Sequence, residues 1–280
     1  MAPNLLFGTG GIPIQSKGGG MLEGVECVKR LGLGAIEWEL VHGVNVKQES
    51  AEALGLKLKQ TGVRLSAHAP YYISLISHEP PKRKKSHAYI LDTARAVHWA
   101  GGGKVVFHPG FYGIYAEDKK KAFEEMKGGM EFLVEEVKRL KLNAVLAPEV
   151  TGKVLQWGTL EELLQMRNEI KGLAITIDVS HVHARSNGGL DTRKDFEKMF
   201  ELIESYDKKN FEDLHVHFQS VNFSAKGELN HLANSEDSPP YKPFAELLAE
   251  YKCSGTIISE SPVLEADALE MKKIYESLNQ

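Results

Sequence analysis

The sequence has few cysteines and no long apolar run. Its 280 residues include two cysteines, Cys27 and Cys253, which excludes a disulfide framework and fits a reducing compartment. No apolar run approaches the ~18 residues that a membrane span requires. Residues 1–4 lack the basic and apolar stretches that begin a signal peptide. We therefore expect a cytoplasmic protein with two inert buried thiols and no membrane partner.

The sequence also lacks a linker, a low-complexity segment and a long block of like charge. It reads as one domain, residues 1–280, and its 42% hydrophobic and 26% charged residues are those of an ordinary globular protein. The net charge of −4 argues against a protein that coats nucleic acid non-specifically. We expect a monomer.

Eight short β-rich runs alternate with longer helical patterns along the chain. The runs recur roughly every 30–45 residues, the length of one unit of an eight-fold βα barrel, and no Gly-x-Gly-x-x-Gly follows the first run. Both features favour an α/β fold with a single (β/α)8 TIM barrel over a doubly wound open sheet. The expected strands are residues 4–8, 35–40, 63–68, 104–108, 144–149, 174–178, 213–218 and 256–260. The expected helices include residues 86–100, 118–140, 159–170, 191–206, 242–251 and 265–278.

Two local signals mark helix starts. Thr159 stands three residues before Glu162, the spacing of a capping box. Pro80 and Pro81 are suited to the first turn of a helix, where a missing N–H costs little.

Six consecutive strands carry a side chain that can bind a metal ion at or near the strand end. In a barrel these ends converge on one mouth, at the C-terminal face of the strands. Carboxylates gathered there would repel one another unless cations lay between them. Imidazoles mixed with carboxylates suit zinc, with manganese, iron or magnesium as alternatives, and bridging carboxylates can hold two ions that hydrolyse a phosphate ester. The residues are His68, His108, Glu149, Asp178, a histidine of the seventh strand, and Glu260.

Further histidines lie on or near the same mouth. His215 and His217 share one face of the seventh strand because side chains alternate. We expect one to be a ligand and the other to line the pocket. His181 follows Asp178 by three residues, and His231 lies in the loop expected after the seventh strand. The remaining histidines lack this pattern and are expected to be surface or structural residues, with His183 left open: His42, His78, His87 and His98.

Five sequence strings resemble the endonuclease IV family of apurinic/apyrimidinic (AP) endonucleases, within the xylose-isomerase-like barrel superfamily. They run from the third strand to the eighth in the family's order, and the whole looks most similar to the family's compact archaeal branch. The strings are SAHAPYYI (66–73), FHPG (107–110), PEVTGK (148–153), IDVSH (177–181) and SESP (259–262).

The resemblance implies a site of two or three zinc ions. His68 and His108 would hold one ion, and Glu149 would bridge it to a second. The second ion's ligands would be completed by Asp178, His215 and Glu260, and a third ion would be bound by His181 and His231. The family has an aspartate two residues before its last histidine, where this chain has Leu229. Glu228 and Asn230 flank that position, and both are candidates to replace the aspartate.

The resemblance also implies an activity. The family hydrolyses the phosphodiester 5′ to an abasic site in damaged double-stranded DNA and leaves a 3′-hydroxyl, by attack of a hydroxide shared between two ions. Tyr71 and Tyr72 stand where the family places residues that intercalate at the lesion, with simple loop packing as the alternative. Lys153 and Arg185 fall on mouth loops and are candidates for phosphate contacts.

Two other functions remain open. A sugar isomerase or epimerase of the same superfamily needs one divalent ion, and Glu149, Asp178, His215 and Glu260 would satisfy it. The additional histidines favour the nuclease. The replacement of aspartate by Leu229 keeps open a non-catalytic barrel that retains its ligands as a regulatory or scaffold module.

Overall fold

The computed structural model describes residues 4–16 and 18–278. Within these residues, eight parallel strands form one curved sheet in the order β5-β4-β3-β2-β1-β10-β7-β6. The strands match the eight expected runs to within a few residues. Their bounds are β1 Leu5–Gly10, β2 Ala35–Glu39, β3 Arg64–His68, β4 Lys104–Phe107, β5 Val145–Pro148, β6 Ile177–Asp178, β7 Leu214–His217 and β10 Gly255–Ser259.

Backbone hydrogen bonds close the sheet between its two outer strands. The Ala174 amide donates to the Leu146 carbonyl at 2.9 Å, and the Thr176 amide donates to Pro148 at 2.9 Å. The Val150 amide in turn donates to Thr176 at 3.0 Å. The approach to β6 therefore pairs with β5, and the predicted (β/α)8 TIM barrel is confirmed.

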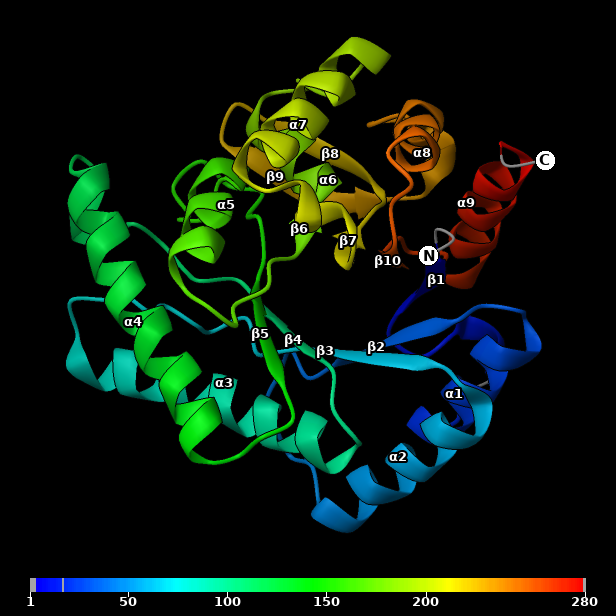
Figure 1. Ribbon diagram of the computed structural model, residues 1–280, viewed down its shortest axis with the longest axis horizontal. Helices are drawn as coiled ribbons and strands as arrows, with labels where there is room; N and C mark the ends of the chain where they lie inside the picture. The colour runs from blue at the N-terminus through cyan, green and yellow to red at the C-terminus, as the bar shows by residue number, and fades with distance from the viewer. Residues whose placement is uncertain (1–3, 17, 279–280) are drawn as a thin grey trace.

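Helices surround the strands and cover the outside of the barrel (Figure 1). Apolar side chains such as Phe107, Ile36 and Phe196 are fully buried in the core. None of the described helices is long and apolar enough to cross a membrane. The surrounding helices are α1 Met21–Arg30, α2 Gln48–Thr61, α3 Pro80–Trp99, α4 Lys119–Arg139, α5 Leu160–Glu169, α7 Arg193–Tyr206, α8 Tyr241–Glu250 and α9 Glu265–Ser277.

Both predicted helix starts are confirmed. The Glu162 amide donates to Oγ1 of Thr159 at 3.1 Å, and the Thr159 amide donates back to Oε2 of Glu162 at 2.9 Å, which completes the capping box of α5. Pro80 and Pro81 occupy the first turn of α3. Both cysteines are buried and free, and burial raises the pKa of the Cys253 thiol to about 12, as expected of inert thiols.

The segment after β7 is not the expected loop. It forms an antiparallel hairpin of β8 (Ser220–Ser224) and β9 (Gly227–Leu232). Gly227, with φ +98°, makes the tight turn that an L side chain rarely adopts. The hairpin packs over α6 (Val179–Arg185), the short helix that follows β6 directly. These two elements cover one side of the mouth.

Candidate metal centre

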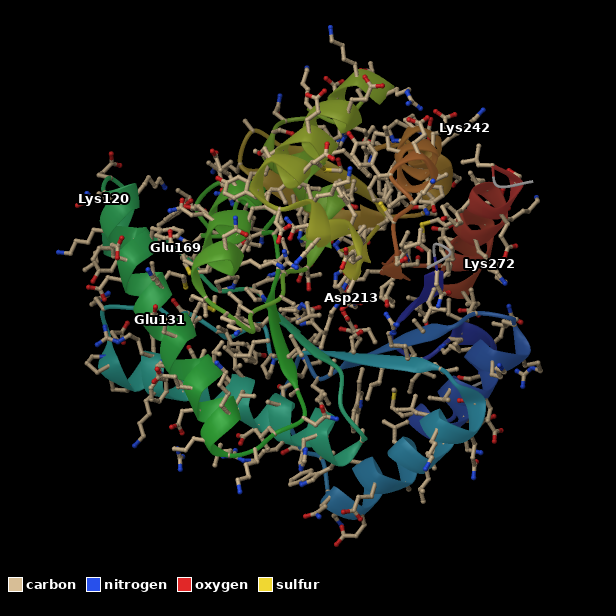
Figure 2. All side chains as sticks on the ribbon, in the orientation of Figure 1. Lys120, Glu131, Glu169, Asp213, Lys242 and Lys272 are labelled. Atoms are coloured by element: carbon tan, nitrogen blue, oxygen red, sulfur yellow. The ribbon has the colours of Figure 1, made fainter. Side chains whose placement is uncertain are left out.

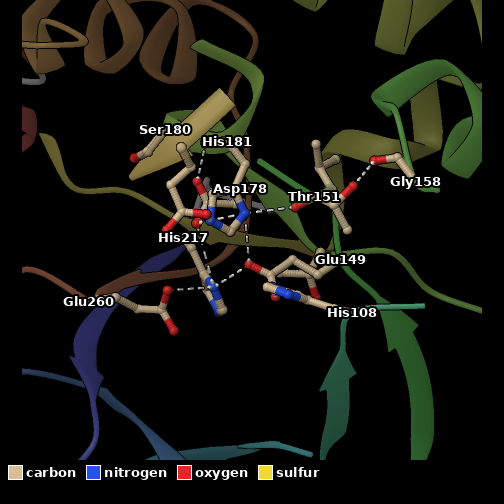
Figure 3. Close-up of polar contacts among 12 residues, drawn as sticks. His108, Glu149, Thr151, Gly158, Asp178, Ser180, His181, His217 and Glu260 are labelled. Carbon is tan, nitrogen blue, oxygen red and sulfur yellow. Dashed lines mark hydrogen bonds and ion pairs between the residues drawn. The ribbon is translucent and has the colours of Figure 1, made fainter. Parts of the chain in front are cut away.

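Glu149 lies at the centre of the mouth, directly after β5, and is fully buried (Figure 3). Its Oε2 is 3.1 Å from Nε2 of His68 and 2.9 Å from Nε2 of His108. Its Oε1 is 3.0 Å from Nδ1 of His217 and 3.6 Å from Nδ1 of His181. One carboxylate therefore touches imidazoles from four different segments, as a bridging ligand would.

Asp178 and Glu260 complete a second group beside Glu149. Nδ1 of His217 is 3.3 Å from Oε2 of Glu260 and 4.0 Å from Oδ2 of Asp178. Asp178 is also the N-cap of α6: its Oδ1 accepts the His181 amide at 2.7 Å, and its Oδ2 accepts Nε2 of Gln219 at 2.9 Å. The capping bond explains the three-residue spacing, because it fixes Asp178 and His181 on the same helix start.

The third corner of the mouth is formed by α6 and the β8–β9 hairpin. Nε2 of His181 is 3.2 Å from Oε2 of Glu228, and Nε2 of His231 is 3.5 Å from Oε1 of the same carboxylate. The side-chain Nδ2 of Asn230 instead donates to the carbonyl of its neighbour His231. Leu229 is 58% exposed. Of the two flanking candidates, Glu228 is the one whose side chain reaches the histidines.

His217, rather than His215, occupies the mouth. The two side chains share the inner face of β7 as expected, but at ~3.3 Å per residue two positions separate them by roughly 6.6 Å along the strand. His215 therefore lies one layer deeper, where its Nε2 is 2.9 Å from Oε2 of Glu37. Nε2 of His217 is 2.9 Å from the other oxygen of Glu37, and the Ser66 hydroxyl donates to Oε2 at 2.6 Å. The assignment of His215 as a mouth ligand is thus corrected by its depth in the barrel.

Two acidic residues of β2 were missed by the sequence reasoning. Glu37 and Glu39 point to the barrel interior because side chains alternate along the strand, and both belong to groups that could hold a metal ion. The signal was present in the sequence as Ile-Glu-Trp-Glu within an expected strand. These residues lie on the second strand, before the first of the six strands whose ends carry the predicted ligands.

Burial and opposite charge act against each other in the mouth. Burial raises the pKa of the Glu149 carboxyl, but the imidazoles of His108 and His217 outweigh it and hold that pKa well below its ordinary value. Burial lowers the pKa of His68, but hydrogen bonding to Glu149 prevails and raises it to about 10. Glu39 is the contrast, since burial and repulsion from other carboxylates raise its pKa to about 8. The carboxylates therefore require positive charge, supplied by protons on the imidazoles or by metal ions.

The donor atoms fit divalent ions. In the described part of the chain, three neighbouring groups of the mouth each bring imidazole nitrogens and carboxylate oxygens within 4.8 Å of one another. Glu149 belongs to two groups and Asp178 to two, so adjacent ions would share ligands. Such mixed nitrogen and oxygen sets suit zinc. The groups are His68, His108 and Glu149; Glu149, Asp178, His217 and Glu260; and Asp178, His181 and His231.

The four residues expected to contact DNA lie around this mouth. Tyr71 and Tyr72 are 56% and 63% exposed, and the Tyr71 ring lies 5.6 Å from the ring of His68. Lys153 is exposed on the loop after β5. Arg185 lies beneath that loop and donates to Oγ1 of Thr151 at 2.9 Å and to the Lys153 carbonyl at 2.8 Å. Its geometry is that of a residue holding the loop in place.

The other histidines lie outside the three groups. Nδ1 of His183 accepts the Leu190 amide at 3.2 Å, and Nδ1 of His98 accepts the Asn143 amide at 3.0 Å. These bonds fix turns of the backbone, and they give the open case of His183 a structural role.

Comparison with known proteins identifies a family and two relatives. The family model described as xylose isomerase-like TIM barrel matches residues 25–278. An uncharacterized protein of Methanocaldococcus jannaschii is 35% identical over 277 residues, covering 98% of each chain. A probable endonuclease 4 of Acholeplasma laidlawii is 25% identical over 166 residues, which cover 57% of this chain and 53% of that protein.

Solved structures share the fold with different named activities. Endonuclease IV from Thermus thermophilus superposes with a TM-score of 0.69 at 19% identity, covering 93% of this chain and 94% of the other. A D-tagatose 3-epimerase-like protein gives the same TM-score and identity, covering 92% and 96%. At this identity the likeness concerns the fold, and the choice between the two activities depends on the residues of the mouth.

Proposed function

This chain belongs to the xylose isomerase-like TIM barrel family, and within that family we propose that it is a zinc-dependent phosphodiesterase that cleaves DNA 5′ to abasic sites. The observation that carries the proposal is the composition of the mouth. Three adjoining groups of imidazoles and carboxylates share Glu149 and Asp178. A cluster of this kind is suited to two or three ions, and closely spaced ions are the arrangement that hydrolyses phosphate esters.

The alternative is an epimerase that uses one divalent ion, and the equal likeness of the two solved folds keeps it in view. Glu149, Asp178, His217 and Glu260 would be sufficient for that ion. The alternative gives no role to the remaining imidazoles of the mouth. Those imidazoles come from four segments, and each contacts a buried or half-buried carboxylate: His68, His108, His181 and His231.

Each ion would be held by a distinct part of the mouth. His68, His108 and Glu149 would hold one, and Asp178, His217 and Glu260 would complete the ligands of the next. The third would be bound by His181 and His231, with Glu228 in place of the aspartate that the endonuclease IV resemblance leads one to expect. The ions, when bound, supply positive charge that polarises a phosphate and lowers the pKa of water.

The chain's own residues supply shape and orientation. Tyr71 lies beside His68 and Tyr72 follows it, and both rings are exposed. Exposed rings at this rim are suited to fill the gap that an extruded abasic nucleotide leaves in the duplex. Lys153 adds positive charge on the neighbouring loop, suited to a backbone phosphate. Arg185 acts indirectly, because its hydrogen bonds hold the loop that carries Lys153.

The test combines metal analysis with a cleavage assay. The purified protein is analysed for metal per chain and incubated with duplex DNA carrying a tetrahydrofuran abasic analogue, with and without a chelator. We expect two or three zinc ions, cleavage 5′ to the lesion, and loss of cleavage on chelation. A single manganese or magnesium ion, no cleavage, and conversion of D-tagatose would favour the epimerase instead.

Glu149→Gln isolates the central carboxylate, since the variant keeps its size and removes its charge. We expect it to fold and to lose cleavage. Glu265→Gln is the matched control: this buried carboxylate accepts the Ile14 and Gln15 amides and belongs to none of the groups described above. Cleavage at the unaltered rate by Glu149→Gln would contradict the proposal.

A further inference from the structure

A cavity of about 900 Å³ opens at the end of the barrel opposite the metal centre. Its walls include the first residues of three strands, Arg64 of β3, Lys104 of β4 and Val145 of β5, whereas the candidate metal ligands of these strands lie at or just after the last residues. Asp213, which precedes β7, also lines it and lies near the middle of the ring of strands (Figure 2). Among the cavity's lining residues none belongs to the three groups of the mouth. The volume falls in the range of small-molecule sites.

Glycines keep one wall of the cavity free of side chains. Gly101, Gly102 and Gly103 line it in succession. A Cβ on Gly103 would lie 2.4 Å from the carbonyl oxygen of Leu65, so the close approach of two backbone segments excludes a side chain there. The space beside this wall is therefore available to a ligand.

Two cations of the cavity share one carboxylate. Nζ of Lys104 is 3.0 Å from Oδ2 of Asp213, and Nη1 of Arg64 is 3.3 Å from Oδ1. The lining residues as a whole carry three cations, Lys59, Arg64 and Lys104, against two carboxylates, Glu212 and Asp213. The cavity therefore has a surplus of one positive charge. The Lys104 side chain is only 13% exposed, where water screens that surplus poorly.

Lys104 and Arg64 have N–H donors that their existing hydrogen bonds do not use. Lys104 donates to the Asp213 carbonyl at 2.8 Å besides its ion pair, and Arg64 donates from Nη1 to Oγ1 of Thr256 at 3.4 Å. Ammonium has three N–H donors and guanidinium has five. Among the described residues, Nε and Nη2 of Arg64 have no acceptor. These donors could bind an anion without breaking the existing pairs.

The inner end of the cavity offers an acceptor. His215 lines it, and Nε2 of the ring is engaged with Glu37 at 2.9 Å. Nδ1 of His215 has no partner among the described residues. With Nε2 donating to the carboxylate, Nδ1 holds a lone pair that a hydroxyl group can donate to. The hydroxyls of Ser66 and Thr256 lie in the same lining.

We propose that this cavity is a second ligand site, which binds a small phosphorylated or carboxylated molecule with several hydroxyl groups, the class to which sugar phosphates belong. The anionic group is bound by Arg64 and Lys104, and the hydroxyls reach His215, Ser66 and Thr256 at the inner end. The proposal uses no residue of the three groups of the mouth and does not depend on the phosphodiesterase assignment.

Isothermal titration calorimetry on the metal-loaded protein tests the site with three probes. Ribose 5-phosphate carries both features, inorganic phosphate carries the charge alone, and ribose carries the hydroxyls alone. We expect ribose 5-phosphate to bind at least tenfold more tightly than inorganic phosphate, and ribose to show no heat. No binding of ribose 5-phosphate at millimolar concentration would overturn the proposal, and equal affinity for phosphate would overturn the hydroxyl contacts.

Variants locate the binding. Arg64→Met and Lys104→Met should each raise the Kd at least tenfold, and Val145→Phe, which fills the cavity without changing its charge, should abolish binding. Lys127→Met is the matched control, since Lys127 is also a partly buried lysine paired with one carboxylate, Glu169. If Lys104→Met fails to fold, Arg64→Met and Val145→Phe still test the location of the site, because both positions are half exposed. Binding that persists in Val145→Phe, or that is lost on metal removal or in Lys153→Met, would place the ligand elsewhere and overturn the proposal.

Discussion

Glu37 should affect the metal affinity of the mouth by orienting His217, although Glu37 lies deeper in the barrel than the three groups of the mouth. The carboxylate is fully buried and lies within 2.9 Å of Nε2 of both His215 and His217, while Ser66 donates to it. The contact with Nε2 turns the His217 ring so that Nδ1 faces Glu149. Glu37→Gln keeps the size of the side chain but removes the charge that fixes this orientation.

The expected loss has two parts. Removing a carboxylate that orients a metal-binding histidine weakens metal affinity 10–100-fold, or about 1.4–2.7 kcal/mol. Burial raises the pKa of Glu37, but His217 and His215 outweigh it and hold the pKa far below its ordinary value. Breaking a buried pair of this kind costs about 3 kcal/mol or more. We therefore expect the metal-free Glu37→Gln protein to lose about 3 kcal/mol of unfolding free energy.

Two measurements separate these parts. Zinc titration against a competing chelator gives the metal affinity, and urea unfolding of the metal-free protein gives the stability. Glu265→Gln serves as the control, because its buried carboxylate accepts two backbone amides and touches no metal ligand of the mouth. The control should lose stability and keep its zinc affinity. Wild-type zinc affinity in Glu37→Gln would refute the orienting role.

The remaining predictions concern the third corner and the loop after β5. Burial lowers the pKa of His231 but Glu228 raises it to about 9, above the ordinary 6.5, so the metal-free protein should lose stability as pH rises from 6.5 through 9, measured by thermal melting. Glu228→Gln should flatten that pH dependence and reduce bound zinc by one ion per chain in elemental analysis, whereas Leu229→Ala should change neither. Arg185→Lys should lower the unfolding free energy by about 1–3 kcal/mol in urea, because lysine cannot reproduce the fork of hydrogen bonds to Thr151 and the loop. An Arg185→Lys protein of wild-type stability would contradict this role.

The barrel was predictable because its strands are short, apolar and regularly spaced. The run at residues 104–108, for example, becomes β4 at Lys104–Phe107. The hairpin was not predictable in the same way, since Gly227–Leu232 is half exposed and presents no apolar face. Alternation of apolar and polar residues marks strands that bury one face, and it is absent from strands that are polar on both faces.

The candidate ligands likewise include some that the sequence predicts and some that it does not. His68, His108 and Glu149 were predictable from their positions at strand ends, because all strands of a parallel barrel end at the same mouth. The positions along β7 order the two histidines, since His217 is nearer the end of the strand. The layer of the barrel that holds the other ligands depends on strand pairing, in which Asp178 lies opposite His217. Register depends on pairing between distant segments, which alternation within one strand does not encode.

The β-bulge in the hairpin explains how Glu228 reaches the third corner although Leu229 stands where the resemblance leads one to expect an aspartate. Asn222 pairs with Asn230 and Phe223 with Glu228, so Leu229 is the extra residue of the bulge and is left without a partner. In a regular strand, Glu228 and His231 are three positions apart and would face opposite sides. The bulge shifts the alternation by one residue, which allows both to reach His181 and each other. Position 229 is then free to be leucine, because the backbone carries the acid to the mouth from position 228.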